Sequence, residues 1–392
     1  MTNKLQPRLR FKGFTELWTQ RQLGEVATVF DGPHATPSKT ERGPWYLSIS
    51  SLIDGRVDLD QSAHMSEEDL ATWTKRVSPL PGDTLFSYET RIGQAGHWDF
   101  EEQASLGRRM GLLRPKDGAI DVWYLTLSYL GPQFQDVINE NTVSGGTVER
   151  IPIADMPNWP LVVPSIAEQK RIGEFFRLLD DLITANQSKA DQLQHLKRAY
   201  LQQLFPAPGQ VIPHLRFPSF RENWSLKPLG ELAQIKTGSS DVQDAVSSGA
   251  YPFFIRSQNV ERSNKYLYDG EAILIPGEGR LGEIFHYTKG KFDFHQRVYK
   301  ISDFIDSVDA KFILYTMQAT FKKHAMSHTV KATVDSLRLP MLTEYQLMLP
   351  GVEEQRLLGH FFYCLDELNR AQNERVEHLK CLKRGYLQKM LV

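Results

Sequence analysis

The chain has 392 residues, and at roughly 150 residues per domain this length predicts two or three folded units. Hydrophobic residues make up 41% and charged residues 24%, which supplies packed cores and excludes a disordered chain. Because 46 lysines and arginines balance 47 acidic residues, net charge neither requires nor excludes an anionic partner. No apolar run reaches the ~18 residues of a membrane span, the N-terminus lacks an apolar stretch, and two cysteines are too few for a disulfide framework. We therefore expect a folded protein of the reducing cytoplasm, neither secreted nor inserted in a membrane.

An internal repeat opens the two halves of the chain. Residues 7–32, PRLRFKGFTELWTQRQLGEVATVFDG, align without gaps to residues 213–238, PHLRFPSFRENWSLKPLGELAQIKTG, and 12 of the 26 positions are identical. Both copies contain the tripeptide Leu-Gly-Glu and a tryptophan, Trp18 in the first and Trp224 in the second. Since shared aromatic positions of this kind most often pack in a core, we expect the repeat to build the same core twice.

A second repeat covers residues 164–205 and 350–391, where 17 of 42 positions are identical. Apolar residues recur at spacings of three and four, no proline follows the opening residue, and basic residues gather near each C-terminal end, which predicts two long α-helices. About 38 residues at 1.5 Å each make a helix of about 57 Å, so each helix needs an equally long partner. We expect the two to form an antiparallel coiled coil with each other. The alternative is that each helix docks on its own globular domain.

The remaining segments predict two similar globular domains. A Pro-Ala-Pro-Gly sequence breaks the first helix, after which the N-terminal repeat begins again. Each half contains a strand-like run, at residues 82–87 and 270–275, and a later helical run, at residues 122–127 and 311–316. The fold class is therefore α+β, with two pseudo-symmetric α/β domains separated by two long helices that form an antiparallel coiled coil. The expected boundaries are a globular domain over 1–163, a central helix region over 164–206, a second globular domain over 207–349 and a C-terminal helix region over 350–392.

Motifs for catalysis are absent from the sequence or weak. The segment GEGRLG at residues 277–282 matches the dinucleotide-binding pattern G-x-G-x-x-G. The residues after it resemble a strand and not a phosphate-capping helix, so we interpret it as a tight β-turn. His324 and His328 have the spacing of metal ligands but lack a third ligand nearby, which favours a surface loop. The sequence contains no Walker A loop, H-E-x-x-H, G-x-S-x-G or zinc pattern, which argues against a free-standing enzyme.

The distribution of charge restricts any nucleic-acid surface to a narrow stripe. Residues 1–165 carry 16 basic and 21 acidic side chains, a balance of −5, and residues 211–350 carry 17 and 15, a balance of +2. Arg91 and Arg280 stand out because each lies two residues before a glycine at an equivalent place, where arginine suits a phosphate contact or a bidentate contact to guanine. Ordinary surface charge is the alternative for every candidate. The DNA-binding candidates are Arg91, Arg108, Arg109 and Arg150 in the first half, and Arg256, Arg280, Lys322, Lys323 and Lys331 in the second.

The repeated plan resembles the DNA-specificity subunit of type I restriction-modification systems over essentially the whole chain. In that family each long helix begins with P-x-x-x-E-Q and carries a later Leu-Asp. The matching residues here are Pro164 to Gln169 with Leu179-Asp180, and Pro350 to Gln355 with Leu365-Asp366. The Leu-Gly-Glu sequences that begin at Leu23 and Leu229 also fit the opening of each recognition domain in the family.

The resemblance implies that residues 1–163 and 207–349 are target-recognition domains and that the chain is a non-catalytic reader of double-stranded DNA. Each domain would read one half of a bipartite, asymmetric target, while the helix pair sets the spacer and docks two modification subunits. S-adenosylmethionine would be bound by those subunits, and ATP and Mg by restriction subunits that join them, with no cofactor or metal on this chain. The rival hypothesis is a coiled-coil scaffold without sequence-specific DNA binding. Salt-sensitive, sequence-dependent binding to duplex DNA would separate the two.

Overall fold

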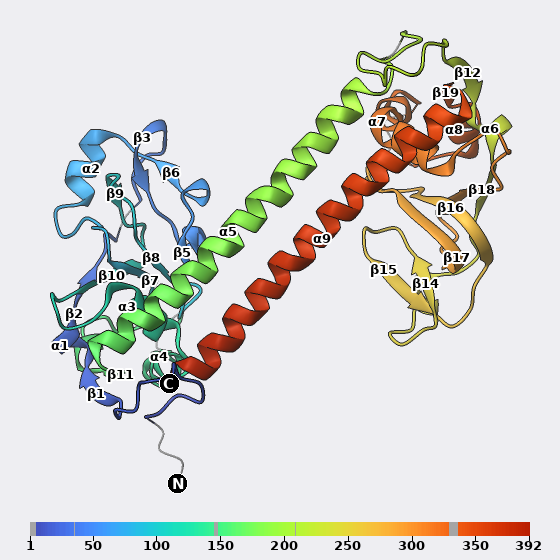
Figure 1. Ribbon diagram of the computed structural model, residues 1–392. Helices are drawn as coiled ribbons and strands as arrows, with labels where there is room; N and C mark the ends of the chain where they lie inside the picture. The colour runs from blue at the N-terminus through green and yellow to red at the C-terminus, as the bar shows by residue number, and fades with distance from the viewer. Residues whose placement is uncertain (1–4, 35, 145–147, 208, 329–335) are drawn as a thin grey trace. The chain divides into compact units, whose positions relative to one another are not determined.

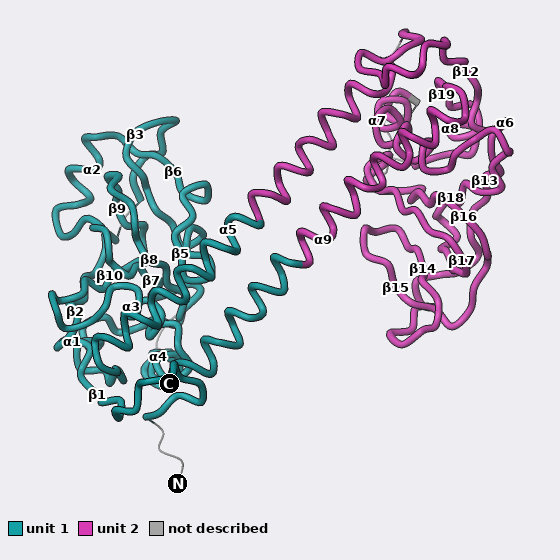
Figure 2. Tube along the Cα trace, in the orientation of Figure 1, with its two compact units in different colours: residues 1–186, 375–392 teal, residues 187–374 magenta. Residues whose placement is uncertain are grey.

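The computed structural model describes residues 5–34, 36–144, 148–207, 209–328 and 336–392. The chain forms two compact units (Figure 2). Unit 1 comprises Met1–Asn186 with Arg375–Val392, and unit 2 comprises Gln187–Glu374. Each unit therefore contains one globular domain together with part of each long helix. The boundaries predicted from the sequence place each long helix in a region of its own, whereas the division into these two units cuts both helices.

Unit 1 is built on a six-stranded sheet with the order β2-β10-β7-β8-β5-β4 (Figure 1). Its pairs are antiparallel except β5 with β8, which are parallel. The sheet strands are β2 Ala27–Asp31, β4 Leu52–Ile53, β5 Gly55–Val57, β7 Thr84–Ser87, β8 Ala95–His97 and β10 Met110–Pro115. Two smaller sheets join β1 Thr19–Gln22 to β11 Pro160–Val163, and β3 Thr40–Tyr46 to β6 Ala63–His64 and β9 Ala104–Ser105. The α-helices of the globular part are α1 Leu23–Val26, α2 Glu67–Trp73, α3 Val122–Leu130 and α4 Pro132–Asn141.

Unit 2 repeats this sheet, with the order β13-β18-β16-β17-β14-β15. Its strands are β13 Gln234–Thr237, β14 Tyr251–Phe254, β15 Val260–Ser263, β16 Tyr268–Pro276, β17 His286–Phe294 and β18 Val298–Ser302. The single parallel pair is again between the fourth and fifth strands in the order, β17 and β14. A two-stranded sheet joins β12 Ser225–Pro228 to β19 Gln346–Leu349, and the shorter helices are α6 Leu229–Leu232, α7 Ala310–His328 and α8 Leu339–Thr343. The predicted α+β class, the two strands and the two helical runs are confirmed.

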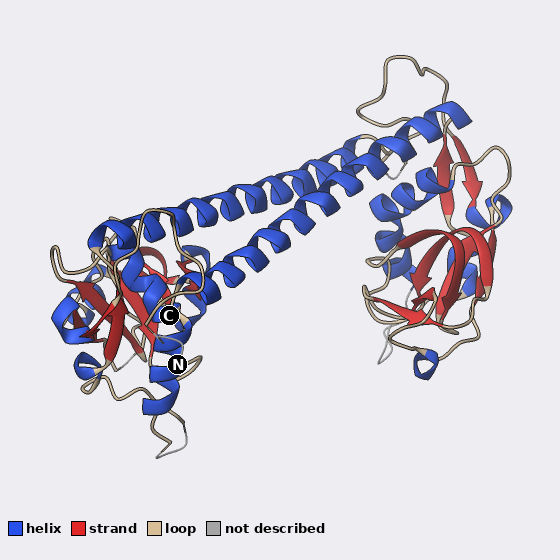
Figure 3. Ribbon diagram, turned by 60° about the horizontal axis from the view of Figure 1, so that its bottom comes forward, coloured by secondary structure: helices blue, strands red, loops and turns tan. Residues whose placement is uncertain are grey.

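The long helices are α5, Ile166–Gln203, and α9, Val352–Met390. Figure 3 shows both as continuous helices, with the strands gathered in the globular parts. In unit 1 the ring centroids of Phe175 and Tyr386 lie 5.2 Å apart, and in unit 2 those of Tyr200 and Phe361 lie 5.3 Å apart. Because a residue early in one helix meets a residue late in the other in both units, the helices pair in antiparallel fashion, as predicted. No helix within the described residues is both long and apolar enough to cross a bilayer.

Each long helix also docks on the globular domain that precedes it, so the alternative arrangement is present as well. The Glu168 carboxylate accepts hydrogen bonds from Nε and Nη2 of Arg10, at 2.6 and 2.7 Å, and from the indole Nε1 of Trp18 at 3.2 Å. In unit 2 the carboxylate of Glu354 accepts the same two bonds from Arg216, at 2.8 and 2.7 Å. The glutamate of the P-x-x-x-E-Q sequence therefore ties each helix to the repeated N-terminal segment. Burial of both tryptophans confirms the predicted packing role of that segment.

The glutamine of the same motif holds the N-terminus of α3. The Gln169 side-chain carbonyl accepts from the backbone N–H of Asp121 at 2.9 Å, and Asp121 in turn caps the N-terminus of α3. A Cβ atom added to Gly173, one turn further along α5, would lie 2.7 Å from the Asp121 carboxylate. Glycine at that position therefore permits the close approach of the two helices. Unit 2 repeats the contact with Gln355 and the backbone N–H of Asp309, at 3.1 Å.

Candidate nucleic-acid interface

The four arginine candidates of unit 1 surround the loop that follows β7. Within this loop the Tyr88 backbone N–H donates to the carbonyl of Arg109, and the Tyr88 carbonyl accepts from the backbone N–H of Ile151. These two bonds bring three separate segments together, and the arginines on them are Arg91, Arg108, Arg109 and Arg150. The structure thus assembles all four candidates of this half at one loop cluster.

Three of the five candidates of unit 2 surround the equivalent loop, between β16 and β17. Arg280 lies in the loop itself, Arg256 forms an ion pair with Glu278 at 3.0 Å, and Lys322 of α7 forms one with Glu283 at 2.6 Å. Lys323, the next residue of α7, is exposed and makes no ion pair with a described residue. Lys331 lies outside the described residues.

The G-x-G-x-x-G segment of this loop is a turn between strands, as predicted. β16 ends at Pro276 and the next element is β17, so no helix follows that could bind a phosphate. Gly279 and Gly282 have φ values of 85° and 66°, a conformation that favours glycine. A Cβ atom on Gly282 would lie 2.8 Å from Cα of Lys322, so this glycine also lets the loop pack against α7.

Strand register makes the two loops equivalent residue by residue. Ser87 pairs with Met110 in unit 1, and Pro276 pairs with Val298 in unit 2. Counting from these pairs, three residues of unit 1 correspond to three of unit 2: Glu89 to Glu278, Arg91 to Arg280, and Arg109 to Arg297. Arg297 was missed in the sequence analysis. The signal that could have found it is its place immediately before β18, since Arg109 stands immediately before β10.

The two loop clusters differ in how their cations are paired. In unit 1, Arg109 forms an ion pair with Glu89 at 2.6 Å. Among the described residues no carboxylate lies within ion-pair distance of Arg91, Arg108 or Arg150. The loop cluster of unit 1 is therefore more cationic than the balance of −5 for its half suggests.

In unit 2 two carboxylates each bind two cations. Glu278 binds Arg297 at 2.7 Å in addition to Arg256, and Glu283 binds Arg280 at 2.7 Å in addition to Lys322. The hydrogen bond from Arg297 lowers the pKa of the Glu278 carboxyl below its ordinary value, and the bond from Lys322 does the same for the pKa of Glu283. Both carboxylates are therefore ionised at neutral pH, and they offset part of the positive charge at this loop.

The loop of unit 1 also holds two neighbouring polar side chains, His34 and Tyr88, that the sequence analysis did not identify. Nε2 of His34 lies 2.9 Å from the Asp31 carboxylate, and its Nδ1 lies 3.4 Å from the Tyr88 hydroxyl. Burial, with the nearby charges of Asp31 and Glu89, raises the pKa of Tyr88 to about 12. The tyrosine is therefore a neutral hydrogen-bonding group at neutral pH. The residue of unit 2 at the position of Tyr88 is Gly277. The feature of the sequence that could have identified Tyr88 was therefore a difference between the two halves and not a repeated residue.

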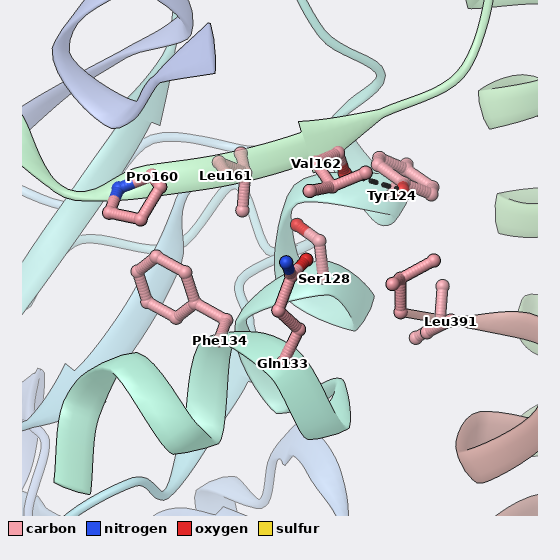
Figure 4. A pocket seen from close by; sticks show the side chains of 9 residues that line it. Tyr124, Ser128, Gln133, Phe134, Pro160, Leu161, Val162 and Leu391 are labelled. Carbon is pink, nitrogen blue, oxygen red and sulfur yellow. Dashed lines mark hydrogen bonds between the residues drawn. The ribbon is translucent and has the colours of Figure 1, made fainter. Parts of the chain in front are cut away.

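A small pocket in unit 1 lies between α3, α4, β11 and the end of α9 (Figure 4). The hydroxyl of Tyr124 donates to the carbonyl of Val162 at its edge. The side chains that line it include no carboxylate, imidazole or cation: Tyr124, Ser128, Gln133, Phe134, Pro160, Leu161, Val162, Leu391 and Val392. These groups offer no acid, base or metal ligand, so the pocket is not a candidate site.

Among the described residues no group of three histidine, cysteine or carboxylate side chains could hold a metal ion. The prediction that His324 lies in a surface loop is wrong, because His324 belongs to α7 and its Nε2 lies 2.9 Å from the Met341 carbonyl. The helix extends further than the sequence suggested because its inner face packs on the core through Phe321 and Ala325.

Comparison with known proteins identifies relatives of one kind. Residues 221–378 match the family described as "Type I restriction modification DNA specificity domain". The Type I restriction enzyme EcoDI specificity subunit of Escherichia coli is 28% identical over 169 residues, which cover 43% of this chain and 37% of the length of that protein. The Type I restriction enzyme MjaVIII specificity subunit of Methanocaldococcus jannaschii is 22% identical over 368 residues, covering 86% of this chain and 83% of that protein.

Solved structures have the same fold. The S subunit of a Type-I restriction-modification system from M. genitalium aligns with a TM-score of 0.70 at 16% identity, covering 99% of both chains. A chain solved in work on complex assembly and conformational transition of the type I R-M system aligns with a TM-score of 0.54 at 18% identity, covering 96% of this chain and 98% of that one. At these identities the likeness concerns the fold alone.

The chain is a duplicated two-domain protein. It contains two copies of one α+β domain, each with arginines at equivalent loops and each tied to the antiparallel helix pair. Residues 221–378 match the type I restriction modification DNA specificity domain, and the chain is similar to type I restriction specificity subunits over most of its length. The relatives are named as specificity subunits of such systems, and no catalytic role is assigned to this chain.

Proposed function

We propose that this chain reads a bipartite, asymmetric DNA target, with one half-site read by each globular domain. The observation that carries the proposal is the pair of equivalent loops with Arg91 and Arg280, set at the same register of two duplicated sheets. Cations beside a hairpin loop can contact phosphates and base edges of a duplex. Two similar domains joined by an antiparallel helix pair are suited to half-sites in opposite orientations. Because the loop clusters carry different side chains, the half-sites should differ in sequence.

We propose that the helix pair sets the spacer between the half-sites and docks two modification subunits, which restriction subunits then join. Two long helices that pair with each other present a continuous ridge for partners. S-adenosylmethionine would be bound by the modification subunits, and ATP and Mg by the restriction subunits, so this chain would bind no cofactor itself. The place of action would be the cytoplasm, where chromosomal DNA is accessible.

Mapping of methylated adenines tests this proposal. The chain is co-expressed with its modification subunit in a host that lacks such systems, and modified adenines are located across the host genome. We expect a two-part motif with a fixed gap, present only when both chains are made. A complex that forms but leaves the genome unmodified would favour the scaffold hypothesis, and modification by this chain alone would contradict the non-catalytic role.

The spacer role has its own test. Removing the same seven residues, about two helical turns, from the middle of both α5 and α9 keeps the two helices matched. We expect the gap in the motif to shorten while both half-sites stay the same. An unchanged gap in an assembled complex would contradict the proposal that the helices set the spacer.

A further inference from the structure

The guanidinium group of Arg297 is held by only one of its three nitrogens. Nη1 lies 2.7 Å from both carboxylate oxygens of Glu278, whereas Nε and Nη2 make no hydrogen bond to any described residue. The backbone is fixed on both sides, because the Arg297 N–H donates to Nδ1 of His295 and its carbonyl accepts from Gly277. The side chain is 55% exposed. One edge of the guanidinium is therefore anchored, and the edge formed by Nε and Nη2 is open to solvent.

Glu278 is itself held in place, which makes it a firm anchor. Its Oε2 accepts a second bond from Nη1 of Arg256 at 3.0 Å, and its backbone forms a bridge with Ser336. The two guanidinium groups that it binds keep the carboxylate ionised. Fixing an arginine through a buried or paired carboxylate removes side-chain freedom that would otherwise be lost on binding.

The equivalent arginine of unit 1 has no such open edge. Arg109 is bound to Glu89 through Nε, at 2.6 Å, and its Nη1 lies 3.4 Å from the Thr90 hydroxyl. Among the described residues only Nη2 is left without a partner. The same arginine–glutamate pair is thus present in both units, but only unit 2 leaves two adjacent donors available. The two domains therefore offer different chemistry at equivalent positions.

We propose that Arg297 is a specificity-determining residue of unit 2 and that Glu278 is its positioning residue. The open edge presents two parallel N–H donors, which match a planar pair of acceptors. In the major groove that pair is O6 and N7 of guanine. The inference rests on the proposed function and deepens it, because it assigns a G·C base pair to the half-site read by unit 2. An anchored edge favours a base over a phosphate, since base reading requires one fixed orientation.

The test compares three variants in the co-expression assay: Arg297→Lys, Glu278→Gln and Arg109→Lys. Lysine keeps the charge of Arg297 but removes the two parallel donors, so we expect about tenfold or greater loss of selectivity at one G·C position of one half-site. Glu278→Gln should relax the same position to a smaller degree, because the amide retains one acceptor for Arg297. Arg109→Lys is the matched comparison in unit 1, where Nε is already bound to Glu89. Any change that it causes should fall in the half-site read by unit 1 and leave the G·C position read by unit 2 unchanged. Copurification with the modification subunit establishes that each variant is assembled.

Each other outcome overturns the inference. Arg297→Lys with an unchanged motif but uniformly weaker methylation would mean that Arg297 contacts a phosphate. An unchanged motif at unchanged efficiency would mean that Arg297 serves only the fold. If Arg297→Lys does not assemble, Glu278→Gln must relax one position by itself, and failure to do so contradicts the inference. Absence of any two-part motif with the unaltered chain would instead refute the proposed function, and the inference with it.

Discussion

Units 1 and 2 share one scaffold but differ in the polar contacts at their equivalent loops. Both have the same strand order and the same contact from a motif glutamate to an arginine of the N-terminal repeat. In unit 1 three loop arginines lack ion pairs with described residues although the first half has a net charge of −5, whereas in unit 2 two carboxylates bind four cations although the second half has +2. The net charge of a domain is therefore a poor guide to the charge of its candidate binding surface. Four predictions test how far the two units differ.

The largest difference in stability between the two units should come from the ion pairs that join the long helices. Lys383 and Asp180 form an ion pair of 2.6 Å in unit 1, with side chains only 6% and 7% exposed. The equivalent pair in unit 2, Lys197 with Asp366, is also 2.6 Å long but more exposed, at 17% and 36%. Lys383→Met should lower the free energy of unfolding by about 3 to 5 kcal/mol, because it leaves a buried aspartate unpaired. Lys197→Met should cost about 1 kcal/mol, and denaturant unfolding measures both.

The buried pair should add little net stability, because the cost of desolvating it offsets its attraction. Burial raises the pKa of Asp180 in spite of its bond to Lys383, which means that desolvation outweighs the attraction. The double variant Asp180→Leu with Lys383→Met should therefore recover most of the stability lost by Lys383→Met. Equal losses from the two lysine substitutions, or a double variant as unstable as the single one, would contradict this difference between the units.

The second prediction concerns pH. His97 of unit 1 stacks on Trp123, with ring centroids 3.9 Å apart, and burial lowers the pKa of His97 from 6.5 to about 4. The imidazole is neutral in the folded state, so below pH 6.5 the unfolded chain binds more protons. Unit 1 should therefore lose up to about 3 kcal/mol as the pH falls from 6.5 to 4. His97→Phe should remove this part of the pH dependence.

Register places Tyr287 at the position of His97 in unit 2, so the two units should respond differently to acid. Burial also lowers the pKa of His286 and His295 in unit 2, and some loss of stability is expected there as well. Denaturant unfolding at pH 7 and pH 5 gives the measurement, with the exposed His195→Gln as control. A wild-type pH dependence in His97→Phe would show that the histidine does not titrate as its burial requires.

Much of this architecture could be predicted from the sequence because the N-terminal segment and the long helix each occur twice in it. The helices α5 and α9 repeat a period of three and four, and the N-terminal segments repeat their buried tryptophans, so periodicity and identity were sufficient. Arg297 could not be found in this way, since the residues around β10 and β18 have diverged and their equivalence depends on strand register. The ion pairs of Glu278 and Glu283 also depend on side chains from separate strands and from α7. Only the folded chain brings these groups together.

The third prediction concerns the repeated tryptophans. The indole of Trp18 donates to Glu168 at 3.2 Å, whereas Nε1 of Trp224 is buried without a hydrogen-bond partner among the described residues. Both Trp→Phe substitutions remove similar apolar volume, but only Trp18→Phe also removes a bond to a carboxylate, a loss of about 1.5 to 3 kcal/mol. Trp18→Phe should therefore be the more destabilising by about 2 kcal/mol in thermal or denaturant unfolding. Equal effects would mean that the bond to Glu168 contributes nothing to stability.

The smallest expected effect, and the one closest to function, separates paired from unpaired loop arginines. Arg91 makes no ion pair with a described residue, so its full charge is available to a phosphate. Arg280 must exchange Glu283 for the phosphate and therefore gains less from binding. We expect Arg91→Ala to weaken binding of the complex with its modification subunit to its target duplex by about 1 kcal/mol, and to reduce the salt slope by about 0.9.

Arg280→Ala should give less than half of either change, measured by titrating the same duplex between about 50 and 200 mM salt. Glu283→Gln is the matched test of the cause. It frees Arg280 without removing its charge, so it should strengthen binding and steepen the salt slope. If Arg280→Ala costs as much as Arg91→Ala and Glu283→Gln has no effect, the carboxylates do not restrain the cations of unit 2. In that case the two loops would contribute equally to DNA affinity, and the difference between the units would be confined to the bases they read.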